Sequence, residues 1–156
     1  MRRRQFITLL GGAAAWLSPA RAQEPRRVIG VLSSLGSRGF FAEVLMLAFS
    51  RGLKDAGFVE GRNISIELRL ADDHYDRLPS LAAELVGRDV AAIYAPDLPS
   101  AFAAKAATTT LPIVFIIGAD PVKVGLVDSL SRPQDNLTGC QRFSQCPRTK
   151  ARGVFA

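Results

Sequence analysis

The stretch that decides the fold is IVFIIGADPVKVGLV, residues 113–127. Its first five residues are all apolar, which is typical of a short strand buried on both faces of a sheet. A glycine, an acidic residue and a proline interrupt that run between Gly118 and Pro121. Because Asp120 can cap a helix and Pro121 fits a first helical turn, the segment predicts a strand, a tight loop and a short helix over 122–130.

The same order of elements recurs along the rest of the chain. Apolar runs predict strands over 28–33, 63–70 and 90–95, and residues 137–139 begin a fifth strand. Apolar residues at helical spacing predict helices over 41–56, 76–87 and 99–108. Strands and helices that alternate with short connections form a parallel sheet with right-handed crossovers. The predicted fold class is therefore α/β, with helices on both faces of the sheet in three layers.

The N-terminus has the pattern of a signal peptide over residues 1–22. Three arginines precede the apolar stretch 6–20, and Ala20 and Ala22 supply the small residues of a cleavage site. The stretch is shorter than the roughly 18–20 apolar residues of a spanning helix, so we expect export to the periplasm without stable membrane insertion. Arg3 and Arg4 also fit a twin-arginine signal, and the choice between the Sec and twin-arginine routes stays open.

The net charge depends on which segment is counted. The whole chain carries +6, which taken alone would favour a nucleic-acid or anionic partner. Four of its 20 basic residues lie in residues 1–22 and four follow Cys140, whereas all 14 acidic residues lie between them. Residues 23–140 therefore carry a net charge of −2, with interspersed signs. Nucleic-acid binding is disfavoured because no basic stripe could follow a phosphate backbone.

The sequence contains few candidate catalytic residues. His74 is the single histidine, in a loop with Asp72, Asp73 and Asp76, where it could act as a base or simply be solvated while Asp76 caps the next helix. A small periplasmic α/β hydrolase or isomerase using His74 and its neighbouring aspartates is the alternative function. No G-x-S-x-G, G-x-G-x-x-G or P-loop motif occurs, so no enzyme activity, cofactor or metal site is predicted.

Ligands of open parallel sheets bind outside the carboxyl ends of the strands. The loops at that edge are predicted to be residues 33–39, 71–75, 96–100 and 118–122, all rich in Gly, Ser, Asp or Pro. In the last loop, the Asp120 carboxylate could be the N-cap of the following helix or meet a ligand's ammonium group. The two roles are compatible.

Four blocks of sequence resemble one family. They are MRRRQFITLLGGAAAW (1–16), FSRGLKDAGFVEGRNISIELRLADDHYDRLPSLAAELV (49–86), AAKAATTTLPIVFIIGADPVKVGLVDSL (103–130) and RPQDNLTG (132–139). Together they resemble the substrate-binding proteins of ABC transporters, of the tryptophan- and tyrosine-binding type. The resemblance covers essentially residues 1–139.

This resemblance implies a periplasmic binding protein of two α/β lobes, which holds an amino acid or other small molecule in the cleft and delivers it to permease subunits. Residues 23–139 would form the first lobe. The implied ligand contacts come from three loops, and they are Ser33, Ser34, Asp97, Ser100, Gly118, Asp120 and Pro121. The segment 96–99 departs from the family pattern, in which smaller residues are usual.

After Gly139 the periodic pattern stops. Residues 140–156 contain four basic residues and no acidic one, and they predict an aperiodic, disordered tail. Cys140 and Cys146 could form a bridge there, but the core depends on none. Since family members are about twice as long, we expect a truncated or frame-shifted copy that binds its ligand weakly or not at all.

Overall fold

A computed structural model describes residues 26–36, 40–129 and 136–141. The signal peptide over 1–22 and residues 142–156 of the expected tail lie outside these ranges. The described strands are β1 (Arg27–Ser33), β2 (Ile64–Leu70), β3 (Ala92–Ala95), β4 (Ile113–Ile117) and β5 (Leu137–Gln141). The described helices are α1 (Phe40–Asp55), α2 (Leu78–Gly87), α3 (Leu98–Ala107) and a 3-10 turn, η1 (Tyr75–Arg77).

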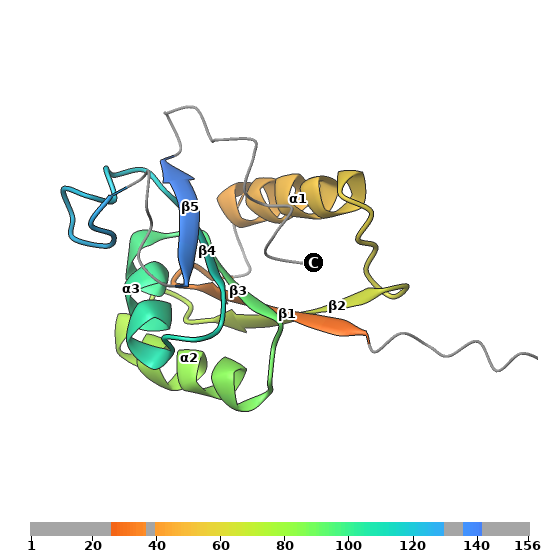
Figure 1. Cartoon of the computed structure of the whole chain (residues 1–156), viewed down its shortest axis with the longest axis horizontal. Helices are drawn as coiled ribbons and strands as arrows, with labels where there is room; N and C mark the ends of the chain where they lie inside the picture. The colour runs from red at the N-terminus through yellow and green to blue at the C-terminus, as the bar shows by residue number, and fades with distance from the viewer. Residues whose placement is uncertain (1–25, 37–39, 130–135, 142–156) are drawn as a thin grey trace, which may run out of the picture.

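The five described strands form one parallel sheet in the order β2-β1-β3-β4-β5 (Figure 1). The predicted α/β fold class is thereby confirmed. After β1 the chain places β2 on one side and then crosses over to place β3 on the other. The strand order reverses at this point, so the loops after β1 and β3 leave the sheet side by side at the position where such folds bind ligands.

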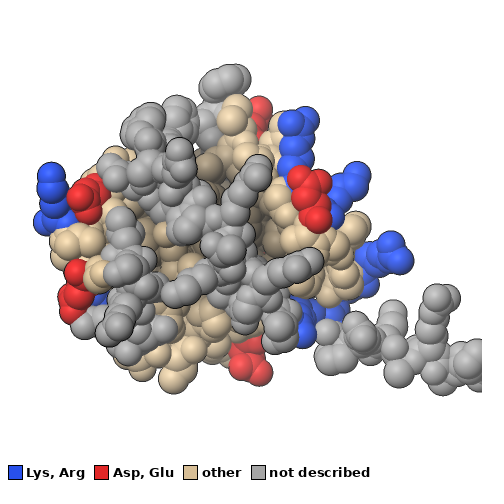
Figure 2. Space-filling model, turned by 45° about the horizontal axis from the view of Figure 1, so that its top comes forward, with Lys and Arg blue, Asp and Glu red and all other residues tan. Residues whose placement is uncertain are grey.

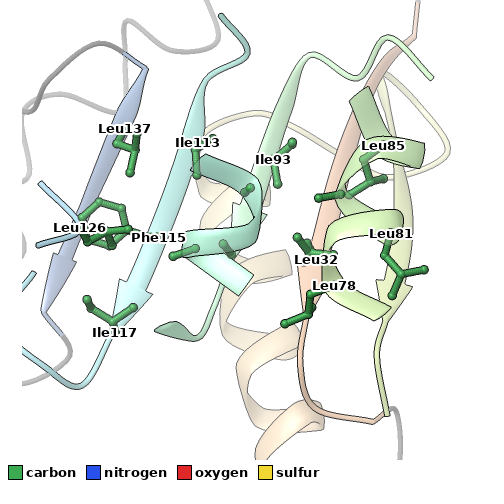
Figure 3. Close-up of a cluster of buried hydrophobic side chains, with 14 of the residues drawn as sticks. Leu32, Leu78, Leu81, Leu85, Ile93, Ile113, Phe115, Ile117, Leu126 and Leu137 are labelled. Atoms are coloured by element: carbon green, nitrogen blue, oxygen red, sulfur yellow. The ribbon is translucent and has the colours of Figure 1, made fainter. Parts of the chain in front are cut away.

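Helices cover both faces of the sheet, with α1 on one face and α2 and α3 on the other (Figure 1). The larger core lies under α2 and α3. There Ile113, Phe115 and Ile117 of β4 alternate inward and pack with Leu126 and Leu137 (Figure 3). The smaller core, under α1, joins Ile29 and Ile64 to Leu53, and Phe49 stacks on Tyr94 with the ring centroids 4.2 Å apart. The packing of each face thus follows the strand alternation.

Two glycines allow close approach of neighbouring elements. A Cβ at Gly30 would lie 3.0 Å from a methyl of Leu85, because α2 packs directly over β1 at that point. A Cβ at Gly139 would lie 2.7 Å from the ring of Phe115 on the neighbouring strand. Gly139 therefore requires a residue without a side chain, whereas a side chain at Gly30 would force Leu85 to shift.

The predicted helix over 122–130 is wrong. Residues 121–125 form turns, in which the Pro121 carbonyl accepts hydrogen bonds from the N–H groups of Leu126 and Val127. Gly125 has φ of 74°, a left-handed conformation that ends a helical turn and that glycine adopts at little cost. The apolar residues here reach the core from a compact loop.

Several predicted boundaries also shift, most of them by one residue. The α2 helix begins at Leu78 rather than Asp76, because residues 75–77 form a 3-10 turn instead. The third strand begins at Ala92 rather than Val90, and the fifth continues two residues beyond Gly139. Cys140 and Gln141 pair with β4 and so do not belong to an aperiodic tail. Backbone pairing requires no side-chain periodicity, which is why the sequence pattern did not reveal it.

Candidate functional site

The site is built around one carboxylate, Asp97, which follows β3. Its Oδ2 accepts the hydroxyl of Ser33 (3.1 Å) and the backbone N–H of Ser34 (3.0 Å) from the loop after β1. Its Oδ1 accepts the N–H (2.9 Å) and the hydroxyl (2.6 Å) of Ser100 in the first turn of α3. Asp97 is also the N-cap of α3. One side chain therefore fixes two strand-end loops and a helix terminus as a unit.

Burial separates the roles of these residues. Ser100 is 0% exposed, so its hydroxyl serves Asp97 rather than the solvent. Ser33 and Ser34 are 7% and 2% exposed at the edge of the sheet. The Ser33 Oγ additionally accepts the N–H of Leu35 (3.2 Å), which turns the chain sharply after β1. The structure thus brings together four of the seven predicted site residues in one hydrogen-bonded cluster.

The other three predicted residues lie one strand further along, after β4. Gly118 is exposed and Asp120 is partly exposed, whereas Pro121 is buried beneath the loop. The Asp120 Oδ1 accepts the N–H groups of Val122 (3.0 Å) and Lys123 (3.4 Å). Asp120 therefore caps a turn, where the sequence predicted a helix, and no described residue donates to its second carboxylate oxygen. Because β3 and β4 are neighbouring parallel strands, this loop borders the same edge as the Asp97 cluster.

The loop after β2 lies at the same edge of the sheet and is hydrogen-bonded to the loop after β1. The N–H of Ala71 donates to the Ser33 carbonyl (2.9 Å), and that of Asp73 donates to the Ser34 carbonyl (2.8 Å). Asp72 and Asp73 adopt left-handed backbone conformations, with φ of 52° and 63°, which aspartate tolerates better than most residues. The Asp72 carboxylate lies over Gly36, where a Cβ would come within 2.8 Å of Oδ1. The loops after β1 and β2 are consequently held together as well.

His74 lies in this loop with an exposed side chain. Its backbone N–H donates to the Ala71 carbonyl (3.0 Å), and its own carbonyl accepts the N–H of Arg77 (3.0 Å). The predicted capping by Asp76 is wrong, since the N-cap positions are His74 and Arg77 and neither makes a side-chain capping bond. Within the described residues, no group of three or more His, Cys, Asp or Glu could hold a metal.

Sequence reasoning missed the central position of Asp97. The signal was present in DLPS, residues 97–100, because an aspartate followed by a proline within the first turn is typical of a helix start.

On the face shown in Figure 2, acidic and basic side chains lie near one another. Ion pairs of this kind join Arg69 to Glu67 and Glu84, and Arg88 to Glu67. In the described part of the chain no helix is long and apolar enough to cross a bilayer.

An open parallel sheet with polar groups gathered at its switch point is the arrangement in which many α/β proteins bind ligands. Residues 43–149 match the family described as ABC transporter substrate binding protein, and the chain belongs to that family. The match extends ten residues past Gly139, where we expected the resemblance to end. The family consists of solute-binding proteins and gives no support to a hydrolase that uses His74.

The chain is similar to a tyrosine-binding protein of Clostridioides difficile (strain R20291), with 36% identity over 101 residues. That alignment covers 65% of this chain and 29% of the relative. Among solved structures, it is similar to the ligand-free, open structure of a substrate binding protein with adhesive properties from Clostridium difficile. The TM-score is 0.69 with 29% identity, covering 76% of this chain and 40% of that one.

A conserved domain protein from Vibrio cholerae gives the same TM-score of 0.69, at 27% identity, over 74% of this chain and 38% of that one. An ABC domain in complex with L-Trp from Streptococcus pneumonia shares the fold, with a TM-score of 0.67 and 22% identity over 74% and 38% of the two chains. The chain therefore spans well under half the length of these relatives.

Proposed function

We propose that this chain forms the first lobe of an extracytoplasmic solute-binding component of an ABC importer. The observation that carries the proposal is the Asp97 cluster, which holds the loops after β1 and β3 together at the switch point of a family-typical sheet. The role is binding and delivery, not catalysis. Its partners are a small organic ligand and the permease subunits of the transporter, and its location is the periplasm, reached through the signal peptide over 1–22.

The ligand class we propose is an amino acid, as in the tyrosine-binding relative. The partly exposed Asp120 carboxylate would receive the ligand's ammonium group, because the turn uses one of its oxygens and no described residue donates to the other. Ser33, Ser34 and Gly118 would line the contact surface. The loops would be held in place by Asp97, Ser100 and Pro121. The sequence predicted direct ligand contacts for these three residues, and we propose a supporting role for them instead.

The experiment is a titration of the isotope-labelled chain with each common amino acid at millimolar concentration, followed by amide NMR. We expect one group of amino acids to shift the amide signals of residues 33–35 and 118–120, and Asp120→Asn to weaken that response. Asp55→Asn, which removes an exposed carboxylate at the end of α1, is the matched control and should respond like the unaltered chain. If no amino acid moves the strand-end signals, the proposed ligand class is wrong.

A further inference from the structure

β2 is the outermost strand on one side of the described sheet, so only one of its two flanks is paired. The backbone groups of successive residues in a strand point alternately to its two flanks. The Ala71 N–H donates to the Ser33 carbonyl at the end of β1 (2.9 Å), so the odd-numbered residues of β2 bond to β1. Ile66, Leu68 and Leu70 therefore direct their N–H and C=O groups to the other flank, which we call the free flank.

The free flank has a defined length. At its amino end the Gly61 N–H donates to the outward Ile64 carbonyl (3.0 Å), so the turn before β2 covers that residue. Further along, the Arg69 guanidinium donates to the outward Leu68 carbonyl (2.9 Å). Among the described strands, none pairs with residues 66–70 on this flank. This segment is thus open to pairing with a strand of another chain, as unprotected edge strands are.

The side chains of residues 66–70 are complementary to themselves. The apolar ones lie on the face toward α1, and Leu68 among them is 45% exposed. Glu67 and Arg69 lie on the opposite face, where Arg69 pairs with Glu84 of α2 (2.9 Å) and with Glu67 (3.4 Å). Reading the segment backwards keeps its apolar positions and exchanges the acidic residue for the basic one. A strand of this pattern matches an antiparallel copy of itself.

We propose that β2 pairs with β2 of a second copy of this chain, antiparallel, about a two-fold axis at Leu68. In this register Leu68 lies opposite Leu68 of the second copy in a hydrogen-bonded pair, and Ile66 lies opposite Leu70. Glu67 then lies opposite Arg69 of the second copy, in the pairs where antiparallel side chains come closest. Because the axis is two-fold, this attraction occurs twice in the dimer.

The charges favour a second copy over an unrelated strand, because one segment supplies both the acidic residue and its basic complement. The Arg69 guanidinium already reaches the free flank through its bond to the Leu68 carbonyl, so it stands where the second copy would approach. β5 forms the other side of the described sheet, and pairing through β2 leaves that side unchanged. The proposal lies beyond the importer function proposed above and does not depend on it.

The backbone test measures self-association of the full chain by sedimentation at increasing concentration. We expect the unaltered chain to form a concentration-dependent dimer. Leu68→Pro removes the N–H that donates to the second copy and no hydrogen bond to β1, so this variant should fold and stay monomeric. Leu68→Thr keeps that N–H and a strand-favouring side chain, and it should still dimerise. Circular dichroism and thermal unfolding check that both variants are folded.

The charge test examines the register and does not depend on the folding of Leu68→Pro. Glu67→Arg and Arg69→Glu each place like charges opposite one another twice in the dimer. Each should therefore dimerise about tenfold more weakly than the unaltered chain, since each reversed pair has an effect of a few-fold. A mixture of the two variants restores both pairs of opposite charge and should recover the lost association. Lys123→Glu, on the exposed loop after β4, is the charge control and should dimerise like the unaltered chain.

Three results would overturn the proposal. One is an unaltered chain that stays monomeric at every concentration. Another is a Leu68→Pro variant that is folded and dimerises as tightly as Leu68→Thr, which would assign the contact to a different surface. The third is a mixture of Glu67→Arg and Arg69→Glu that associates no more tightly than either variant alone, because the two-fold register requires these residues to be paired.

Discussion

At the scale of single residues, Asp97 connects segments that are far apart in the sequence. Its carboxylate accepts four hydrogen bonds, two from Ser33 and Ser34 and two from Ser100. A partly buried carboxylate that satisfies several donors is costly to replace, because each donor left without an acceptor remains desolvated. The alignment of the two strand-end loops therefore depends on this one side chain.

We predict that Asp97→Asn lowers the free energy of unfolding by about 1–3 kcal/mol. The asparagine oxygen can still accept from Ser100, but its NH₂ group would face the donors of Ser33 and Ser34. Chemical denaturation of the purified chain measures the change. Asp55→Asn is the control, for which a change within about 0.5 kcal/mol is expected at an exposed surface position. Equal stability of the two variants would show that the Asp97 cluster is not a structural link.

At the scale of elements, the close packing of α2 on β1 depends on Gly30. Leu85 occupies the space that a side chain at this position would need, and it is itself fully buried. By contrast, a Cβ at Gly52 on α1 would have no neighbour within 4 Å. A larger residue is therefore expected to be costly at position 30 and tolerated at position 52.

Gly30→Val should destabilise the chain by about 1–3 kcal/mol through overpacking against Leu85. Combining it with Leu85→Ala should recover part of that loss relative to additive behaviour, because the smaller residue vacates the contested space. Gly52→Ala should instead stabilise by about 1 kcal/mol, since alanine has the higher helix propensity. Thermal and denaturant unfolding of the unaltered chain, the two single variants, their combination and Gly52→Ala would check this. Strict additivity of Gly30→Val and Leu85→Ala would contradict the proposed contact.

At the scale of the whole molecule, the chain forms one lobe and its relatives are longer, since it covers 40% or less of each. A ligand held between two lobes loses most of its contact with water on closure, whereas a ligand on a single lobe keeps one face solvated. The polar contacts proposed for Ser33 and Asp120 would then compete with solvent. The affinity of the lobe for an amino acid should accordingly depend on whether a second lobe is joined to it.

We expect this chain alone to bind its amino acid about a thousandfold more weakly than a version joined to a second lobe. That factor corresponds to about 4 kcal/mol of closure and second-lobe contacts. Calorimetry of both proteins with the amino acid found by NMR measures it. Equal affinities would show that this lobe is a complete site by itself.

Much of the architecture could be predicted from local patterns. The run 113–117 predicted β4 with its observed bounds, and Asp120 accepts backbone N–H groups as expected, although they belong to a turn and not to a helix. The same local reasoning gave the wrong result for residues 122–130, because apolar spacing in a short segment fits a folded loop as well as a helix. It also placed the start of α2 at Asp76, since a 3-10 turn and an α-helical turn share nearly the same spacing.

The sequence by itself determined all five strands and three of the four predicted helices to within a few residues, because burial period, capping and turn preference depend on residues only a few positions apart. Only the tertiary structure decided that β1 lies between β2 and β3, which brings Ser33 within 3.1 Å of a carboxylate 64 positions away. It also decided that α1, β1 and β2 enclose an apolar pocket that Ser33 and Pro96 line. Such contacts arise from crossover direction and strand register, which are set by the packing of the whole sheet rather than by any local pattern.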